Sequence, residues 1–473
     1  MAASSTHRSV LDKIRPLLVI AGATGTGKTK LAVDVCTQFH GEVISADSMQ
    51  IYKGLDIATN KATDEEMCGV RQHMISEIDP SVTFFNVINF RDRVLNALED
   101  VWSRHKLPVI VGGTKYYIES ILWQVLLTHK TQRTPIRSFT EIAVEECDQG
   151  WGGLSNEQLH EKLKAVDPDT ASVVHFNDRK RVIASLSHFH RFGETRSEAI
   201  AQQRLRGGSS LGGALRFRNV LVFWLRCNYD VLDRRLDSRV DQMLASGLCN
   251  EVTDFYDSHF HRYKSELDAL SEEYGVGCPE SVFCGHKGVF QSIGLKEFLP
   301  YLQLSSEERC SSNGEQLLCK CVDQLKLRTR QYARKQDKWV KRRFLQAPDR
   351  QVPPVYAFDV EDPSTWDASV KKPVCEIVED FLSGRPSRHS ALARDPVDID
   401  QWRRQRDTSL RHCALCHTTI SGLFQWQQHL RSRRHKKLQA KLKKQQSALS
   451  ATLDCVVAYG SAVKSVEKES VRV

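Results

Sequence analysis

The sequence predicts an α/β fold, a P-loop doubly wound parallel sheet with a helical insertion domain, followed by a small C-terminal Cys2His2 zinc finger. Three observations predict it. The apolar run 17–21 passes through a glycine-rich turn into a helical pattern at 28–39, as strands and helices do in parallel sheets. Other apolar runs alternate with helical stretches such as 90–104. Near the C-terminus, two cysteines and two histidines have the spacing of zinc ligands.

The strands of the sheet are expected at four apolar runs separated by helical patterns, which makes the sheet parallel. These runs are 17–21, 42–45, 109–111 and 220–225. Helical patterns with few strand candidates between about 125 and 205 indicate an insertion. The expected divisions are a flexible N-terminus or targeting segment at 1–15, a catalytic core at 16–125 and 215–345, a helical insertion at 126–214, a linker and tail at 346–404, the zinc finger at 405–437 and a disordered tail at 438–473.

Length and composition exclude several classes of protein. A chain of 473 residues with 41% hydrophobic and 26% charged residues is an ordinary globular protein of several domains. The longest apolar run near the N-terminus, 17–21, is far shorter than the ~20 residues of a membrane span, so we expect no membrane partner. Fourteen cysteines without a secretory signal indicate a reducing compartment. The basic N-terminus suits a mitochondrial presequence, so we expect mitochondrion and cytoplasm, with the nucleus left open.

The net charge of +9 is concentrated in two segments. Residues 401–446 hold twelve Lys or Arg and one acid, Asp407, which leaves the rest of the chain about neutral. Residues 326–343 hold nine Lys or Arg and one acid, Asp337. Basic segments of this kind favour a polyanionic partner such as nucleic acid, although either could be a solvated helix face.

A phosphate-binding loop, Gly22-Ala-Thr-Gly-Thr-Gly-Lys-Thr29, follows the first strand. Its glycines let backbone N–H groups turn onto phosphate oxygens, Lys28 adds a full positive charge, and the hydroxyl of Thr29 is placed to hold Mg²⁺. We expect the diphosphate-binding residues to be Thr24, Gly25, Thr26, Gly27, Lys28 and Thr29. The second, metal-organising Asp of ATPases and kinases is missing, because the strand at 109–111 ends in Gly112-Gly113-Thr114. ATP hydrolysis is therefore poorly supported, and the bound diphosphate would be a leaving group.

Asp47 follows the second strand, at the carboxyl end of the sheet where open α/β folds bind ligands. A carboxylate there could accept a proton or a hydrogen bond from a nucleophile. The structural alternative is a helix N-cap.

The C-terminal cluster Cys413-x₂-Cys416-x₁₂-His429-x₅-His435 predicts a structural Zn²⁺ with a closed tetrahedral set of ligands. The long histidine spacing and Phe424-Gln-Trp426 resemble matrin-type fingers, which are often associated with RNA. A protein-binding finger is the alternative.

Taken in order, the motifs resemble those of tRNA dimethylallyltransferases, also called tRNA isopentenyltransferases. They are the phosphate loop, Ser45–Lys61, Val111–Tyr117, Arg239–Leu244, Gln291–Phe298 and Thr329–Gln336 with Trp339, and they span about 15 to 345. The C-terminal finger suits the eukaryotic form of this family.

The resemblance implies transfer of a dimethylallyl group from dimethylallyl diphosphate to the N6 amine of the adenosine on the 3′ side of the anticodon, forming N6-isopentenyladenosine. It implies catalytic roles for Asp47 as base, Thr24 in the loop and Arg239 at the leaving group. It implies Mg²⁺ in catalysis and the tRNA anticodon stem-loop as partner, and we expect a monomer. The residues expected to contact tRNA are Asp47, Ser48, Met49, Gln50, Thr114, Arg179, Lys180, Arg181, Val182, Ile183, Gln291, Arg330, Arg334 and Lys335.

Two other functions compete with prenyl transfer. A small-molecule or nucleoside kinase accounts for the phosphate loop alone. A noncatalytic RNA-binding protein accounts for the finger and the basic segments, but leaves the loop, Asp47 and Arg239 without a purpose.

Overall fold

The structure is a computed structural model that describes residues 15–124, 151–259 and 288–446, apart from 81, 83, 84 and 152. The chain divides into two compact units. One comprises Met1–Gly152 with Ile200–Pro396, and the other comprises Gly153–Ala199 with Val397–Val473. The expected N-terminal segment at 1–15 lies outside the described residues, except for Arg15.

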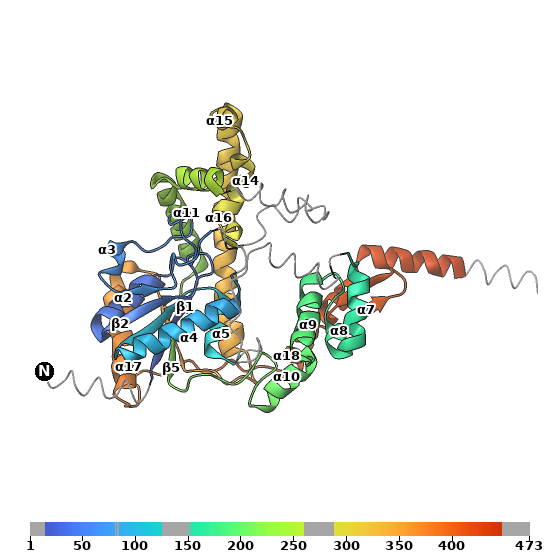
Figure 1. Cartoon of the computed structure of the whole chain (residues 1–473), viewed down its shortest axis with the longest axis horizontal. Coiled ribbons are helices and arrows are strands. Elements are labelled where there is room, and N and C mark those ends of the chain that lie inside the picture. Colours follow the sequence, from blue (N-terminus) through green and yellow to red (C-terminus); the bar gives the residue numbers. More distant parts are fainter. Residues whose placement is uncertain are drawn as a thin grey trace, which may run out of the picture. The chain divides into compact units, whose positions relative to one another are not determined.

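The first unit contains the expected parallel sheet, with six strands where four were expected (Figure 1). Its strand order is β3-β2-β4-β1-β5-β6, and every neighbouring pair is parallel. The strands are β1 (Leu17–Gly22), β2 (Gly41–Ser45), β3 (Gln72–His73), β4 (Leu107–Val111), β5 (Val220–Arg226) and β6 (Val355–Asp359). The carboxyl ends of β1, β2 and β4 therefore meet at one edge, which brings together the loops that carry the sequence motifs.

Both faces of the sheet are covered, because successive strand residues point to opposite sides. Leu17 and Val19 belong to a core built with helices α4 (Val87–Ser103), α5 (Lys115–Leu122), α14 (Leu295–Leu302) and α16 (Ser312–Val340). Leu18 and Ile20 belong to a second core built with α2 (Lys28–Phe39) and α17 (Lys372–Leu382). This is the doubly wound arrangement that the sequence predicts.

The expectation of a linker and tail at 346–404 is wrong over much of its length. The segment contains β6, two short helical turns, η3 (Pro363–Thr365) and η4 (Asp367–Lys371), and α17. β6 pairs with β5 from Val222↔Val355 to Arg226↔Asp359, and the last pair adds a salt bridge of 2.8 Å. Trp366 donates from Nε1 to Asp34 of α2 at 2.9 Å. The segment therefore completes the sheet and covers one face.

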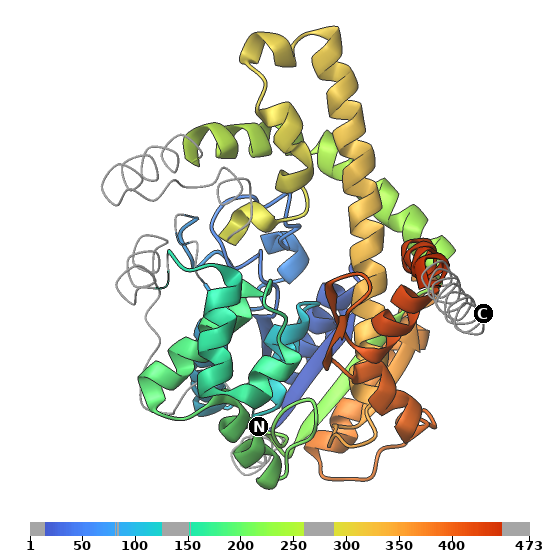
Figure 2. The same cartoon turned by 90° about the vertical axis from the view of Figure 1, so that its right-hand side faces the viewer.

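Helix α16 is the longest helix described, and α15 (Ser306–Arg309) leads into it (Figure 2). It packs along α11 (Tyr229–Ala245) through three ion pairs spaced four residues apart on each helix. These pairs are Arg334–Asp233 at 2.6 Å, Arg330–Asp237 at 2.5 Å and Lys326–Asp241 at 2.6 Å. This ladder of charges fixes the register of two helices that each reach the phosphate loop. The unit also contains α3 (Asp64–Met67), η1 (Gly288–Gln291), η2 (Lys341–Leu345) and helical residues at 248–259.

The second unit combines the helical insertion with the C-terminal finger. Its helices are α7 (Asn156–Val166), α8 (Pro168–Val173), α9 (Arg179–Phe192), the start of α10 (Arg196–Leu205), α18 (Ile399–Arg406) and α19 (Leu423–Arg431), with the hairpin β7 (Leu410–Cys413) and β8 (Thr418–Ser421). A ring nitrogen of His175 lies 3.2 Å from the carbonyl oxygen of Thr419 in β8. Residues 433–446 are helical, so the expected disorder at 438–473 is wrong for 438–446, and 447–473 lies outside the described residues.

No helix in the described part of the chain is long and apolar enough to cross a membrane.

Candidate active site

The phosphate loop joins β1 to α2 in a conformation that requires glycine. Gly25 and Gly27 have φ of +83° and +84°, and a Cβ at Gly25 would lie 2.8 Å from the side chain of Leu236. Gly27 is the N-cap of α2. Because glycine has no side chain to cap the helix, the first N–H groups of α2 are available to an anion. Thr26 is buried and donates its hydroxyl to the carbonyl of Ala23 at 2.8 Å, so that its backbone alone can serve a ligand.

Lys28 lies over the same loop, where its ammonium donates to the carbonyl of Ala23 at 2.7 Å. Burial and the neighbouring Arg239 guanidinium lower the pKa of Lys28 to about 7, and the carboxylate of Asp47 opposes this shift. The lysine therefore lies close enough to both catalytic candidates to interact with them electrostatically. It is poised to gain a proton when an anion binds.

Asp47 begins the turn after β2. Its Oδ1 accepts the N–H groups of Met49 at 2.9 Å and Gln50 at 3.4 Å, which is the capping geometry of the structural alternative. Both bonds end on one oxygen, so the other can accept a proton. Burial raises the pKa of Asp47, and the Lys28 ammonium acts in the opposite direction. A carboxylate with a raised pKa is a stronger base than an exposed one.

Arg239 comes from α11 and reaches the loop. Its Nη1 donates to Oγ1 of Thr24 at 3.2 Å, and its Nε donates to Oδ1 of Asn60 at 2.6 Å. The N–H of Thr24 in turn donates to Oε1 of Gln336 at 2.8 Å. Thr24 is thus held from both sides, by α11 and by α16.

Sequence reasoning missed several residues of this site, above all Gln336 and Tyr332 on one face of α16. Tyr332 is hydrogen-bonded to Thr114 and Gln336, and burial with the nearby Asp47 carboxylate raises its pKa. The two residues lie four apart inside the motif Thr329–Gln336, a spacing that places them on one side of a helix. That spacing was the available signal. Asn60, by contrast, lies in a loop near the end of the motif Ser45–Lys61, where no helical spacing distinguishes it.

The glycine pair after β4 has a structural cause that bears on the kinase alternative. A Cβ at Gly112 would overlap the backbone of Ala46, and a Cβ at Gly113 would overlap the amide of Gln336. The position where a kinase carries its metal-organising Asp is therefore filled by a neighbouring loop and by α16. An acid cannot stand there without displacing both.

The residues expected to contact tRNA fall into separate groups. Ser48 and Thr114 lie beside Asp47, since Oγ1 of Thr114 accepts the N–H of Ser48 at 3.1 Å. Gln291 is exposed in η1, and Lys335 is exposed on α16. Arg330 and Arg334 are engaged in the ladder with α11. Arg179, Lys180 and Arg181 open α9 of the second unit, whereas Val182 and Ile183 are only 0% and 9% exposed and belong to its core.

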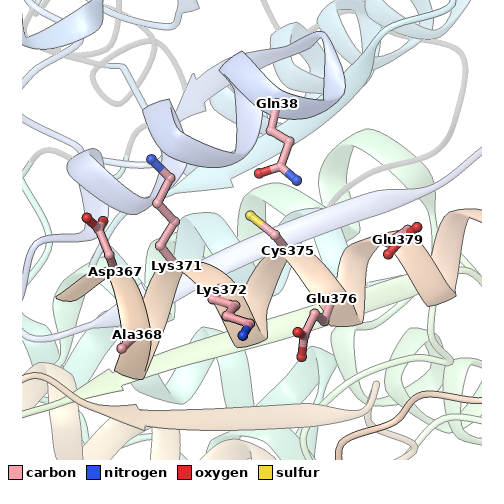
Figure 3. Close-up of a pocket in the computed structure, with 8 residues that line it drawn as sticks. All are labelled: Gln38, Asp367, Ala368, Lys371, Lys372, Cys375, Glu376 and Glu379. Carbon is pink, nitrogen blue, oxygen red and sulfur yellow. The ribbon is translucent and has the colours of Figure 1, made fainter. Parts of the chain in front are cut away.

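Among the cavities in the described part of the first unit, two bear on the site and on the C-terminal segment of the unit. One of about 1270 Å³ is lined by Asn60, Arg239 and the start of α3, so it opens onto the arginine of the site. The other, of about 580 Å³, lies between Gln38 of α2 and the η4–α17 segment, which presents Lys371 and Cys375 (Figure 3). The second cavity shares no residue with the phosphate loop, Asp47 or Arg239. It marks the packing of the C-terminal segment on α2.

The four predicted zinc ligands converge in the second unit. The ligand atoms of Cys413, Cys416, His429 and His435 all lie within 4.8 Å of one another. The hairpin β7–β8 supplies the cysteines, and α19 with the following helix supplies the histidines. Two sulfurs and two imidazole nitrogens are the donor set of a structural zinc, so these residues fit the ion.

Replacing Cys413 with Ser is expected to remove zinc and to unfold residues 405–446. Structural zinc contributes roughly 10–16 kcal/mol in small fingers, which is more than so small a core can supply without it. Metal content of the full chain and limited proteolysis of its C-terminus would measure both effects. Cys310→Ser is the control, because Cys310 is an exposed cysteine outside the cluster. A Cys413→Ser protein that keeps one zinc per chain would contradict the assignment.

Comparison with known proteins agrees with the geometry. The IPP transferase family matches residues 50–343, and a zinc finger of C2H2 type matches 411–435. A Mus musculus protein named tRNA dimethylallyltransferase is 40% identical over 485 residues, covering 100% of this chain and 97% of that protein. A Homo sapiens protein of the same name is 42% identical, covering 90% and 86%. A solved structure of a eukaryotic dimethylallyltransferase acting on tRNA is 29% identical, has a TM-score of 0.70, and covers 92% of this chain and 99% of that one.

Proposed function

The chain belongs to the IPP transferase family and is a transferase that acts on tRNA, and we propose that it joins a dimethylallyl group to N6 of the adenosine on the 3′ side of the anticodon. The donor is dimethylallyl diphosphate. The observation that supports the proposal is the pair of hydrogen bonds on Thr24, because one of them joins Arg239 to the phosphate loop. Lys28 of the same loop lies close enough to Asp47 for their charges to interact.

The reaction divides among these residues. The N6 amine attacks the allylic carbon, the new N–C bond forms as the C–O bond to diphosphate breaks, and the proton of the amine passes to Asp47. An aromatic amine is a weak nucleophile, so the rate must come from alignment and from stabilising the departing charge. The loop N–H groups, Lys28 and Arg239 supply that stabilisation.

Mg²⁺ fits this site through Thr29, which is half-buried in the first turn of α2 directly after Lys28. The ion would shield the charge of the diphosphate. The residues of the chain would still have to orient the diphosphate.

The target base must leave the anticodon stack to reach Asp47, which costs a few kcal/mol that contacts with the RNA backbone offset. Ser48, Thr114 and Lys335 are suited to contacts near the base. The basic start of α9 and the basic helix after His429 are suited to contacts with phosphates. Arg330 and Arg334 would have to leave their carboxylate partners first, so we assign them to holding α11 and α16 together.

The test is the mass of tRNA nucleosides after incubation of the chain with unmodified tRNA, dimethylallyl diphosphate and Mg²⁺. We expect one adenosine beside the anticodon to gain an isopentenyl group in place of a hydrogen. ATP consumption with no change in the nucleosides would instead favour the kinase, and tRNA binding without either reaction would favour a noncatalytic protein.

Raising the pH above about 7 is expected to weaken the binding of inorganic pyrophosphate. The pKa of Lys28 is lowered to about 7 in the free protein, so below that pH the ammonium is already formed. Above it, binding must take up a proton, and affinity falls as pH rises. Titration calorimetry between about pH 6 and pH 9 would measure this. Lys28→Arg is the matched control, since its guanidinium stays charged and the titration of pyrophosphate is common to both proteins. Identical pH profiles would contradict the role of Lys28.

A further inference from the structure

Asn60 lies at the end of a tightly held turn between β2 and α3. Its φ is +51°, in the left-handed region where asparagine is one of the few side chains that are readily accepted. Its Oδ1 accepts the Nε–H of Arg239 at 2.6 Å. The residue thus combines an unusual backbone conformation with a contact to the arginine of the site.

Two sets of contacts fix this turn in place. The carboxylate of Glu251 accepts the N–H groups of Ile57 and Ala58, each at 2.8 Å. The amide nitrogen of Gln50 donates to the carbonyls of Thr59 at 3.1 Å and Asn60 at 3.0 Å. The backbone of the turn that carries Asn60 is therefore held by side chains from two other segments, Glu251 and Gln50.

The same contacts bear on Gln50, which sequence analysis places against tRNA. Its Oε1 accepts the hydroxyl of Ser45 at 3.0 Å, and its Nε2 makes the two bonds to the turn. Both ends of the amide are occupied inside the protein. Gln50 therefore acts on the site through the turn.

For the role of Arg239, the charge of the side chains that accept its hydrogen bonds matters more than their shape. Both side chains that accept hydrogen bonds from Arg239, Asn60 and Thr24, are neutral. Within the described part of the chain, no carboxylate forms an ion pair with Arg239, and the carboxylate of Glu66 interacts with it only from beyond ion-pair distance. A neutral acceptor orients a guanidinium without neutralising it, whereas a carboxylate at the same place would compete with a bound anion.

We propose that Asn60 is a positioning residue that aims Arg239 at the diphosphate through a neutral hydrogen bond and so leaves the charge of the guanidinium for the leaving group. This inference rests on the proposed function, because it takes the diphosphate of the substrate as the anion.

Asn60→Asp tests the inference, since aspartate has the same shape, accepts the same bond and tolerates the same backbone. We expect kcat/KM for dimethylallyl diphosphate to fall about tenfold or more, the size of effect that one opposite charge in contact produces. The inhibition constant of inorganic pyrophosphate should rise in parallel. KM for tRNA should stay within about twofold of the wild type. A purely structural role predicts that the isosteric change does nothing, and that result would overturn the inference.

A second variant and a control complete the experiment. Asn60→Gly keeps the left-handed backbone and removes the acceptor, so kcat should fall while pyrophosphate binding weakens less than in Asn60→Asp. If the Asn60→Asp protein fails to fold, Asn60→Gly still tests whether the hydrogen-bond acceptor of Asn60 matters for the reaction. Asn228→Asp is the matched control, because Asn228 is the exposed N-cap of α11, where aspartate caps equally well.

Calorimetric binding of pyrophosphate to the full chain separates the two proposals. If the wild type transfers no group to tRNA, the proposed function fails, yet the difference in pyrophosphate affinity between the wild type and the Asn60→Asp variant still reports on the arginine. If transfer occurs and Asn60→Asp matches the wild type, the inference alone fails.

Discussion

Asp47→Asn is expected to lower the rate of dimethylallyl transfer by about 10²-fold or more, because an amide cannot take the proton that the attacking amine loses. The change leaves an oxygen to accept the N–H groups of Met49 and Gln50, so the turn after β2 should survive. Single-turnover rates at saturating tRNA and saturating dimethylallyl diphosphate would measure the chemical step. Thermal unfolding would confirm that the fold is intact.

The control for this variant is Asp100→Asn. Asp100 is an exposed carboxylate at the end of α4 that pairs with Arg104 on the surface, and its loss should change the rate by less than about twofold. If Asp47→Asn transfers within a few-fold of the wild type, Asp47 is a capping residue and another group must accept the proton.

Arg239→Gln is expected to lower the single-turnover rate by about 10²- to 10³-fold, the typical loss when one group that stabilises transition-state charge is removed. The loss should appear mainly in kcat, because negative charge on the diphosphate grows as the C–O bond breaks. Arg239→Lys keeps the charge but cannot hold Thr24 and Asn60 at once. It should recover part of the rate.

Arg93→Gln provides the comparison, since Arg93 pairs with Glu77 at 3.1 Å on the surface of α4. Rates for Arg239→Gln equal to those of Arg93→Gln would remove Arg239 from the reaction. Equal effects of Gln and Lys at 239 would show that geometry, and not charge alone, carries its role.

The sequence predicts correctly those elements whose structure depends on residues that are neighbours along the chain. The run 17–21, the loop and the helix 28–39 agree with β1 and α2 to within a residue, because an apolar strand, a glycine turn and a helix follow one another directly. β6 was missed because it is short and its partner β5 lies more than a hundred residues earlier in the chain. No pattern within Val355–Asp359 indicates which strand edge it will join.

The residues of the candidate site likewise differ in whether the sequence predicts them. Thr24, Lys28, Asp47 and Arg239 stand in recognisable motifs, and the structure brings them together. Asn60 and Gln336 also lie inside motifs, but their roles depend on contacts with side chains from distant segments, and a single sequence does not show which side chains they meet. Arg330 and Arg334 show a different limit of the sequence. Their positive charge favoured RNA, but the carboxylates that pair with them lie on another helix.

The late position of β6 has a consequence for how the catalytic unit is made. During synthesis, β1 to β5 leave the ribosome well before Val355–Asp359, so β5 first presents an unpaired parallel edge that carries Phe223 and Trp224. Unpaired edges of this kind favour aggregation. The edge of β5 therefore stays unpaired while α11 and α16 are being translated, and it becomes paired only when β6 emerges. A chaperone that binds exposed strands would act during that interval.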